Sequence, residues 1–156
     1  MKIRRVVTGH DQYGKATISV DEVCKNIISR RDKHQSCVIW STSKFPVDNS
    51  DPVDGSSRDV STLQKEDTVF RIVKYDPGVA PRNHRTETID YAIVMSGAIE
   101  MELDGTVVAL QQGDVIVQRG TIHNWTNKGS VACVIAFILI AAQPIELGTQ
   151  TLVAHG

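Results

Sequence analysis

Residues 89–120 read IDYAIVMSG, AIEMELDG, TVVAL, QQGD and VIVQRG, a series of short β-prone runs separated by turn residues. The first two runs have the composition of strands, with β-branched and other apolar residues between the turns. The Asp104-Gly105 pair is a strong signal for a two-residue hairpin. Strand-like runs flank this stretch at 68–75 and 131–142. Turn signals about every 8–12 residues predict an all-β sandwich or barrel rather than a parallel α/β fold.

The residues before this frame predict an N-terminal hairpin extension that completes a sheet. IRRVVT at 3–8 and ATISV at 16–20 flank a polar segment, a pattern typical of two paired strands. CVIWST at 37–42 also has the composition of a strand. Between them, DEVCKNIISRR at 21–31 places three apolar residues near one helical face after Asp21, which favours a short helix.

The length of 156 residues predicts a single domain, 1–156. Within it we expect N-terminal strands over 1–42 and a barrel frame over about 68–142. Residues 43–67 are polar, contain two prolines and show no periodicity, so we predict a mobile loop there.

Composition narrows the classes of function. Seventeen Lys and Arg residues balance 18 Asp and Glu residues for a formal charge of −1, which argues against nucleic-acid and membrane-surface partners. Three widely spaced cysteines fit neither a disulfide framework nor a zinc knot. The basic N-terminus lacks the apolar stretch of a signal peptide, and the apolar run at 131–142 is too short to span a bilayer as a helix. We therefore expect a cytoplasmic setting.

Two spaced motifs resemble those of the cupin superfamily. The first runs from Gly78 through His84, Thr86 and Asp90 to Gly97, and is similar to Gly-x5-His-x-His-x3,4-Glu-x6-Gly. The second carries five residues in order: Gly113, Arg119, Gly120, His123 and Asn127. The chain departs from the family pattern because Thr86 replaces the second histidine, Asp90 replaces the glutamate, and Arg119 stands at the usual proline. The resemblance covers about 68–142 and implies a small jelly-roll barrel, a double-stranded β-helix, with its ligand site inside.

The resemblance implies that His84, Asp90 and His123 are the metal ligands and catalytic residues. Two imidazoles and one carboxylate with open positions suit Fe(II), Mn(II), Ni(II) or Zn(II). Without a metal, the same histidines are competent general acids or bases when a carboxylate orients them. His84, Thr86 and Asp90 share one parity and would point into one cavity if the strand is unbroken. Thr86 would then hydrogen-bond the ligand. We leave open both the metal and whether Asp90 reaches the site.

Three further residues are candidates for substrate binding. Trp125 shares the strand face of His123 and would floor an aromatic pocket, with core packing as the alternative. Arg71 lies mid-strand, where an outward, solvated side chain is the common arrangement; facing inward, it would be a carboxylate anchor. Gln118 precedes the loop to His123 and would rim the cavity. We read the other histidines, His10, His34 and His155, as surface or hydrogen-bonded residues.

The family likeness predicts the pocket but not the reaction. The reduced ligand set favours an enzyme with redox-neutral chemistry, of lyase or isomerase type: decarboxylation, isomerisation or dehydration of a small acid or aromatic metabolite. One alternative is a non-catalytic ligand-binding or sensor cupin, and a further one is a metal-dependent dioxygenase. The sensor domain of a transcription regulator is disfavoured, because no helix-turn-helix pattern accompanies the barrel.

The apolar run at 131–142 also predicts assembly. It is apolar on both faces, whereas a barrel wall with one face in water should alternate. Its outer face must therefore be covered by residues 1–42 or by a second subunit. We predict a homodimer with residues 1–40 in the interface, and a monomer if segment 21–31 folds back as a helix.

Overall fold

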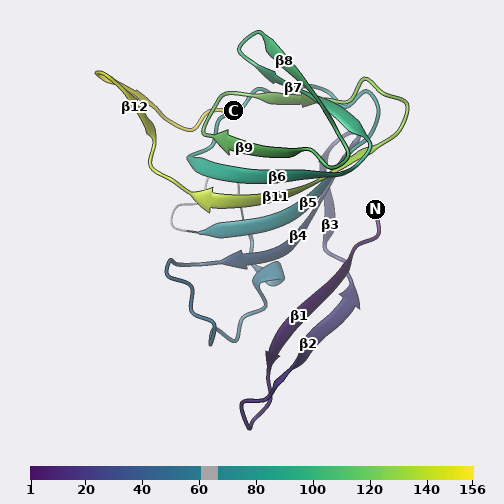
Figure 1. The fold of residues 1–156 in the computed structure, drawn as a ribbon, viewed down its shortest axis with the longest axis vertical. Coiled ribbons are helices and arrows are strands. Elements are labelled where there is room, and N and C mark those ends of the chain that lie inside the picture. The colour runs from purple at the N-terminus through teal and green to yellow at the C-terminus, as the bar shows by residue number, and fades with distance from the viewer. Residues whose placement is uncertain (61–66) are drawn as a thin grey trace.

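A computed structural model describes residues 1–60 and 67–156 (Figure 1). In this part of the chain the elements are β1 (Arg4–His10), β2 (Ala16–Val23), β3 (Ile27–Arg31), β4 (His34–Thr42), η1 (Gly55–Ser57), β5 (Thr68–Tyr75), β6 (Thr88–Ser96), β7 (Ala98–Leu103), β8 (Thr106–Gln111), β9 (Val115–Arg119), β10 (Asn124–Thr126), β11 (Cys133–Ala141), β12 (Ile145–Leu147) and β13 (Gln150–Leu152).

Two antiparallel sheets form the barrel. One has six strands in the order β3-β4-β5-β11-β6-β9, and the other has three in the order β10-β7-β8. Strand β6 alternates buried and exposed residues along most of its length. The predicted all-β, jelly-roll architecture is therefore confirmed.

Inward-facing residues of both sheets make one hydrophobic core. Val69 and Val73 of β5 meet Ile135 and Leu139 of β11, and Ile99 of β7 closes the core from the smaller sheet. Burying an aliphatic side chain of this size contributes about 1.5–3 kcal/mol relative to leaving it exposed. Two of these core residues, Val73 and Leu139, also line the cavity described below.

Two glycine-containing turns set the barrel corners. Asp104 and Gly105 have φ angles of 41° and 87°, so the predicted tight hairpin joins β7 to β8. Gly97, between β6 and β7, has a φ of 76°, and a Cβ there would overlap the Ala132 carbonyl oxygen. Only glycine fits that corner, where the chain crosses from one sheet to the other.

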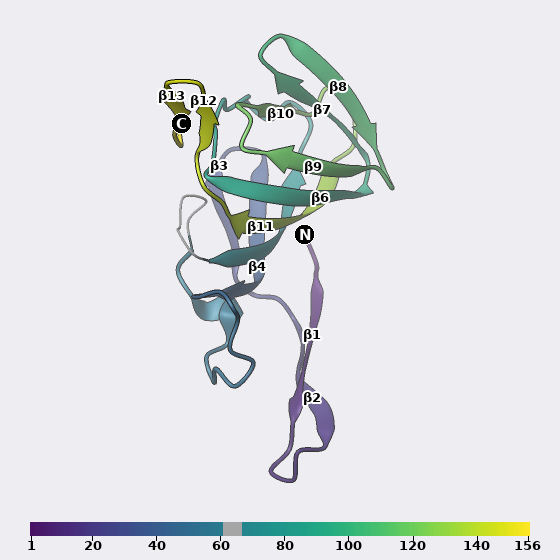
Figure 2. The same ribbon diagram turned by 60° about the vertical axis from the view of Figure 1, so that its left-hand side comes forward.

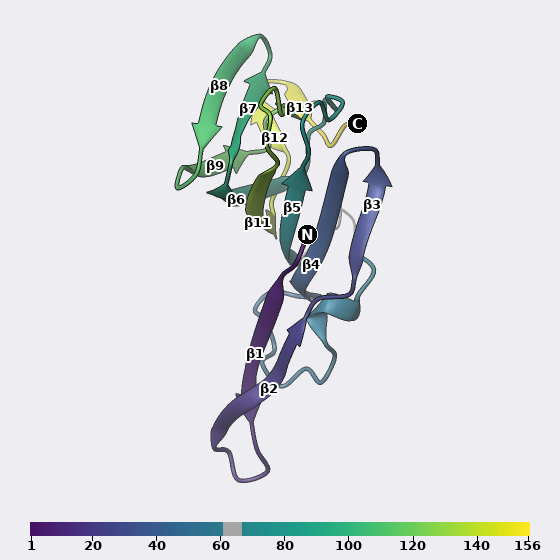
Figure 3. The ribbon, with the colours of Figure 1, turned by 90° about the vertical axis from the view of Figure 1, so that its right-hand side faces the viewer.

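The N-terminal hairpin forms, but it does not complete a barrel sheet. β1 and β2 pair only with each other as a two-stranded sheet, and the ribbon projects away from the barrel in three views (Figures 1, 2 and 3). We call this ribbon, residues 4–23, the arm. The predicted helix over 21–31 is wrong, since these residues contain the end of β2 and all of β3. Strands β3 and β4 instead extend the six-stranded sheet beyond β5. The β-branched residues Val23, Ile27 and Ile28 favour extended pairing over a three-turn helix that lacks a buried partner.

The segment 43–67 is described only in part. Residues 61–66 lie outside the described residues, so the predicted mobility of this loop stays a prediction. In its described part, Gly55 and Val60 are buried. The Arg5 guanidinium of β1 donates to both Asp54 carboxylate oxygens, at 2.7 Å each, which fixes the loop against the base of the arm. Residues 43–60 of the predicted polar loop thus include buried groups.

No helix in the described ranges 1–60 and 67–156 is long and apolar enough to cross a membrane.

Candidate functional site in the barrel cavity

The two motif histidines lie side by side. Each backbone N–H donates to the other residue's carbonyl oxygen, His84 to His123 and His123 to His84, at 3.0 Å in both directions. This isolated antiparallel bridge joins the approach to β6 to the loop between β9 and β10. The ring centroids are 4.2 Å apart. The expected shared cavity for these two side chains is therefore present.

Backbone carbonyls fix the orientation of both rings. His84 Nδ1 lies 3.0 Å from the carbonyl oxygen of Arg82, and His123 Nδ1 lies 3.0 Å from that of Thr121. A carbonyl only accepts, so in the neutral rings each Nδ1 carries the proton and each Nε2 has the free lone pair. The Gln118 side-chain nitrogen lies 3.1 Å from His123 Nε2, to which it can donate.

Burial keeps these imidazoles neutral. It lowers the pKa of His123 to about 4, and the neighbouring His84 and Arg82 act in the same direction. Burial also lowers the pKa of His84, against the opposing effect of the Arg82 carbonyl. At neutral pH both rings are bases rather than acids.

Thr86 and Asp90 both point inward, as the shared parity predicted. Asp90 lies across from Gln118 in the β6–β9 pairing, so its carboxyl group is on the wall beside the histidines. Its Oδ1 atom is buried without a hydrogen-bond partner. Burial raises the pKa of Asp90 to about 6, while Thr88 and Arg71 act in the opposite direction. Thr86 accepts a 2.7 Å hydrogen bond from the Thr88 hydroxyl.

The donor set does not fit a three-ligand metal site. Among residues 1–60 and 67–156, no three His, Cys, Asp or Glu side chains are close enough together to hold a metal ion. The structure thus brings His84 and His123 together but does not bring Asp90 to them, and Thr86 is occupied by Thr88. Catalytic zinc sites use three protein ligands. We therefore derive no chemical step through a metal, and the catalytic roles of these residues stay predictions.

The histidines and Asp90 open onto a cavity of about 530 Å³. Its apolar wall includes three aromatic residues. The ring of Trp125 stacks on Tyr75 at 6.3 Å between centroids and meets Phe137 edge-on at 5.6 Å. A cavity of this volume and lining is typical of small-molecule sites. Trp125 therefore belongs both to the core and to the pocket wall.

Arg71 faces inward, so the common outward arrangement does not apply. It lies opposite Phe137 on β11 and Val38 on β4, both of which line the cavity. The Nε and Nη2 atoms of its guanidinium are buried without hydrogen-bond partners. The condition for a carboxylate anchor, an inward side chain, is met.

The sequence did not assign four titratable residues to the cavity that they line: His34, Arg30, Arg31 and Arg82. The interpretation of His34 as a surface or hydrogen-bonded residue is wrong, because its Nδ1 is buried without a partner. His34 shares a strand face with Ser36 and Val38, which alternation could have shown. The arginines come from loops and an edge strand, where no periodicity signals direction.

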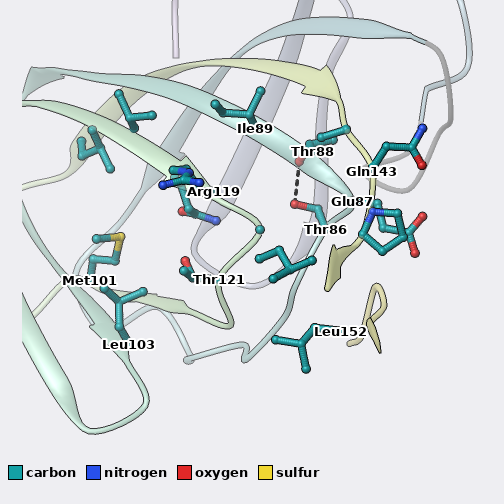
Figure 4. A pocket seen from close by; sticks show the side chains of 17 residues that line it. Thr86, Glu87, Thr88, Ile89, Met101, Leu103, Arg119, Thr121, Gln143 and Leu152 are labelled. Carbon is teal, nitrogen blue, oxygen red and sulfur yellow. Dashed lines mark hydrogen bonds between the residues drawn. The ribbon is translucent and has the colours of Figure 1, made fainter. Parts of the chain in front are cut away.

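A second cavity, of about 610 Å³, lies beside the hairpin β12–β13 (Figure 4). Thr86 lines both cavities, and Gln118 lines this one while contacting His123. Figure 4 shows the Thr88–Thr86 hydrogen bond on its wall, with Met101 and Leu103 of β7 opposite. Gln118 therefore lies between this space and the histidine pair.

Two antiparallel sheets that enclose a cavity with paired histidines define the class of jelly-roll barrels. The chain belongs to the cupin superfamily. The family described as "Cupin domain" matches residues 71–139. Phomopsin biosynthesis cluster protein D of Diaporthe leptostromiformis is 34% identical over 157 residues, which cover 95% of this chain and 83% of that protein.

Two further comparisons bear on activity and fold. The cupin-domain-containing oxidoreductase fogC of Aspergillus ruber is 29% identical over 147 residues, covering 89% of this chain and 72% of that protein. The Schizosaccharomyces pombe Cnp3 cupin domain has a TM-score of 0.55 at 12% identity, over 90% of this chain and 89% of that one, and shows the fold alone. Relatives are named as oxidoreductases rather than lyases, so the comparisons support a cupin enzyme but not the expected redox-neutral reaction.

Proposed function

We propose that this chain is a small-molecule enzyme that moves a proton on a small acid or aromatic metabolite bound in the barrel cavity. Isomerisation, dehydration and decarboxylation are the reactions that such a step serves. The observation that carries the proposal is the pair of imidazoles, whose Nδ1 atoms are held by carbonyl oxygens 3.0 Å away. The Nε2 lone pairs make both rings bases, although that of His123 faces the side-chain nitrogen of Gln118.

The acid and the base have separate environments. The pKa of His123 is lowered to about 4 and that of Asp90 is raised to about 6, both by burial. Near neutral pH the imidazole accepts a proton, and a fraction of Asp90 is protonated and able to donate one. Titratable groups with environments that differ in this way mark acid and base roles. In an isomerisation, the imidazole would take a proton from one substrate carbon and return it to another.

A second candidate function is oxidation or reduction of the same substrate. It is favoured by the names of relatives such as the oxidoreductase fogC. That class includes the metal-dependent dioxygenase considered from the sequence. The remaining alternative is a barrel that binds its ligand without turnover.

One experiment separates these readings. Mixtures of small carboxylic acids are incubated with the protein in D₂O and followed by proton NMR, with dissolved oxygen recorded in parallel. We expect deuterium incorporation or a new product without oxygen uptake. His84→Gln and His123→Gln should each slow this roughly 10²–10⁴-fold, the usual contribution of a general acid or base.

The control is His10→Gln, because His10 is exposed on the arm, outside the barrel. This variant should keep full activity. Oxygen uptake with substrate loss would support the oxidoreductase reading and contradict the proposal. Saturable binding with neither deuterium incorporation nor product would support the ligand-binding reading.

A further inference from the structure

The Arg71 side chain is placed as an anion anchor. Arginine stays protonated in proteins, so a buried guanidinium is a permanent charge. Two of its nitrogens have no hydrogen-bond partner among residues 1–60 and 67–156. Buried charged donors in native structures are nearly always paired, and an unpaired one implies a missing acceptor. Within the described residues, no carboxylate lies within 4.0 Å of Arg71 as an ion-pair partner; Asp90 acts on it only from a greater distance.

Positive side chains predominate around the cavity. Four arginines line it: Arg30, Arg31, Arg71 and Arg82. Among the described lining residues, Asp90 is the single acidic side chain. Arg31 donates to the backbone carbonyl oxygen of Ala80, and this neutral acceptor leaves its charge uncompensated. The cavity therefore attracts an anion from solvent and repels a cation.

The shape of the wall beside Arg71 indicates what the anion is attached to. Phe137 is the cross-strand neighbour of Arg71, and Trp125 packs on Phe137 and, at 5.9 Å, on His123. An aromatic surface therefore runs from the guanidinium to the imidazoles. A planar or apolar body fits along it with one end at each charged or basic group.

We propose that the barrel cavity binds a carboxylate carried on an aromatic or apolar body, and that Arg71 holds the carboxylate. The planar guanidinium matches a carboxylate with two parallel hydrogen bonds. The body then lies against Trp125 and Phe137, and its far end reaches His84 and His123. This rests on the proposed function for the turnover of such a molecule, but the binding site itself does not require turnover.

The test compares phenylacetate with phenylacetamide, which has the same shape without the charge. Affinities are measured by isothermal titration calorimetry, with no reaction needed. The native chain should bind the acid at least roughly ten-fold more tightly than the amide, a difference of about 1.4 kcal/mol. In Arg71→Met, which keeps the side-chain length, the two affinities should become equal.

Two further variants complete the design. Arg4→Met removes an exposed arginine of the arm, outside the cavity, and should leave the preference for the acid unchanged. Arg71→Lys keeps the charge but not the two-pronged geometry, so it should retain only part of the preference. If Arg71→Met does not fold by thermal unfolding, the native ratio and the lysine variant decide.

Several outcomes would overturn the site. These are equal affinities in the native chain, an unchanged preference in Arg71→Met, or no binding of phenylacetate up to roughly 10 mM, ten times a weak Kd. Preference for the acid without any turnover would contradict the proposed function and leave the anion site standing. Turnover of neutral substrates without preference for the acid would contradict the anion site and leave the proposed function standing.

Discussion

The protonation of His34 should make the stability of the chain depend on pH. Burial lowers its pKa to about 4, helped by Arg31, Arg71 and Arg82. At pH 7 the ring is neutral in both states and contributes nothing. As pH falls below the unfolded value near 6.5, the unfolded chain binds a proton that the folded chain does not, so stability is lost down to about pH 4. Solvent reduces the size of this loss, because the ring is only half-buried.

His34→Phe removes this proton uptake while keeping the edge contact with Tyr75, whose ring lies 5.5 Å away. Urea unfolding at several pH values should show the free energy of unfolding of the variant rising relative to that of the native chain as pH falls from 7 to 4. A constant difference across that range would contradict the assignment. His10→Phe, on the exposed arm, is the control and should show no such pH dependence.

The cysteines should be unreactive in the folded chain. Cys24, Cys37 and Cys133 are all buried with free thiols. Burial raises the pKa of Cys37 to about 12 and that of Cys133 to about 11, and the thiolate is the reactive form. A thiol reagent at pH 8 should label no cysteine in the native state and all three of the sequence after unfolding in urea. Rapid labelling of a native thiol would show that its surroundings open.

At the level of elements, the join between the arm and the barrel depends on Arg5. Its side chain is only 4% exposed and forms ion pairs with Asp54 of the loop and Glu22 of β2. Because Asp54 is itself partly exposed, solvent weakens the pair. We expect Arg5→Ala to lower the free energy of unfolding by about 2 kcal/mol, less than the 3–5 kcal/mol typical of a fully buried pair.

Arg4→Ala is the matched control. Arg4 pairs with Asp21 on the same hairpin, but both side chains are largely exposed, at 68% and 48%. Such pairs contribute about 0–1 kcal/mol. Equal losses for the two variants, measured by denaturant unfolding, would show that burial of Arg5 does not matter.

Sequence patterns predicted the strands better than the N-terminal elements. The pairing register of β6 and β7 is well determined, because a slip of one residue would expose the whole core face. Segment 21–31 is short, and its three apolar residues satisfy both a helical face and a pair of strands. Pairing with β1 and with β4, which follows β3 after the two-residue turn Asp32–Lys33, decides for strands.

The residues of the candidate site also differ in how well the sequence predicted them. His84 and His123 follow from motif spacing, and Asp90 from parity. The direction of Arg71 does not, because FRIVK has apolar residues on both sides of it and either phase buries some of them. The phase is set by pairing with β11, where Phe137 faces the cavity.

For the whole molecule, the described residues leave part of the outer face of the six-stranded sheet uncovered: Ile72 of β5 and Ala136 of β11 are buried on this face, whereas β6 and β9 are open along it. The arm does not fold over it, and the helix that would have produced a monomer is absent. Phe70, Tyr91, Ile93, Met95 and Val117 are all exposed on this face. They adjoin Ile138 of β11, which is half-buried. Contiguous apolar patches of this kind mark interaction surfaces.

The outer sheet face and the arm both favour a second copy of the chain as the partner that covers them. The arm has its own exposed apolar residues, including Val6, Ile18 and Val23, and packs only on itself beyond its base. Two-fold symmetry lets each arm and each sheet face serve the other copy, and a stable interface needs about 800 Å² from each partner. We therefore keep the prediction of a homodimer with residues 1–40 in its interface.

Light scattering at micromolar concentration tests this assembly. The expected mass is twice the 17.1 kDa of the chain, and a single 17.1 kDa species would contradict the dimer. Ile93→Lys puts a charge at the centre of the outer face and should shift the mass to the monomer, because burying an unpaired ammonium opposes association. Ile93 is 44% exposed in the isolated chain, so the substitution should leave the monomer folded. Val107→Lys, at an exposed site on β8 of the other sheet, is the control and should remain dimeric, since that strand lies away from both the arm and the outer face.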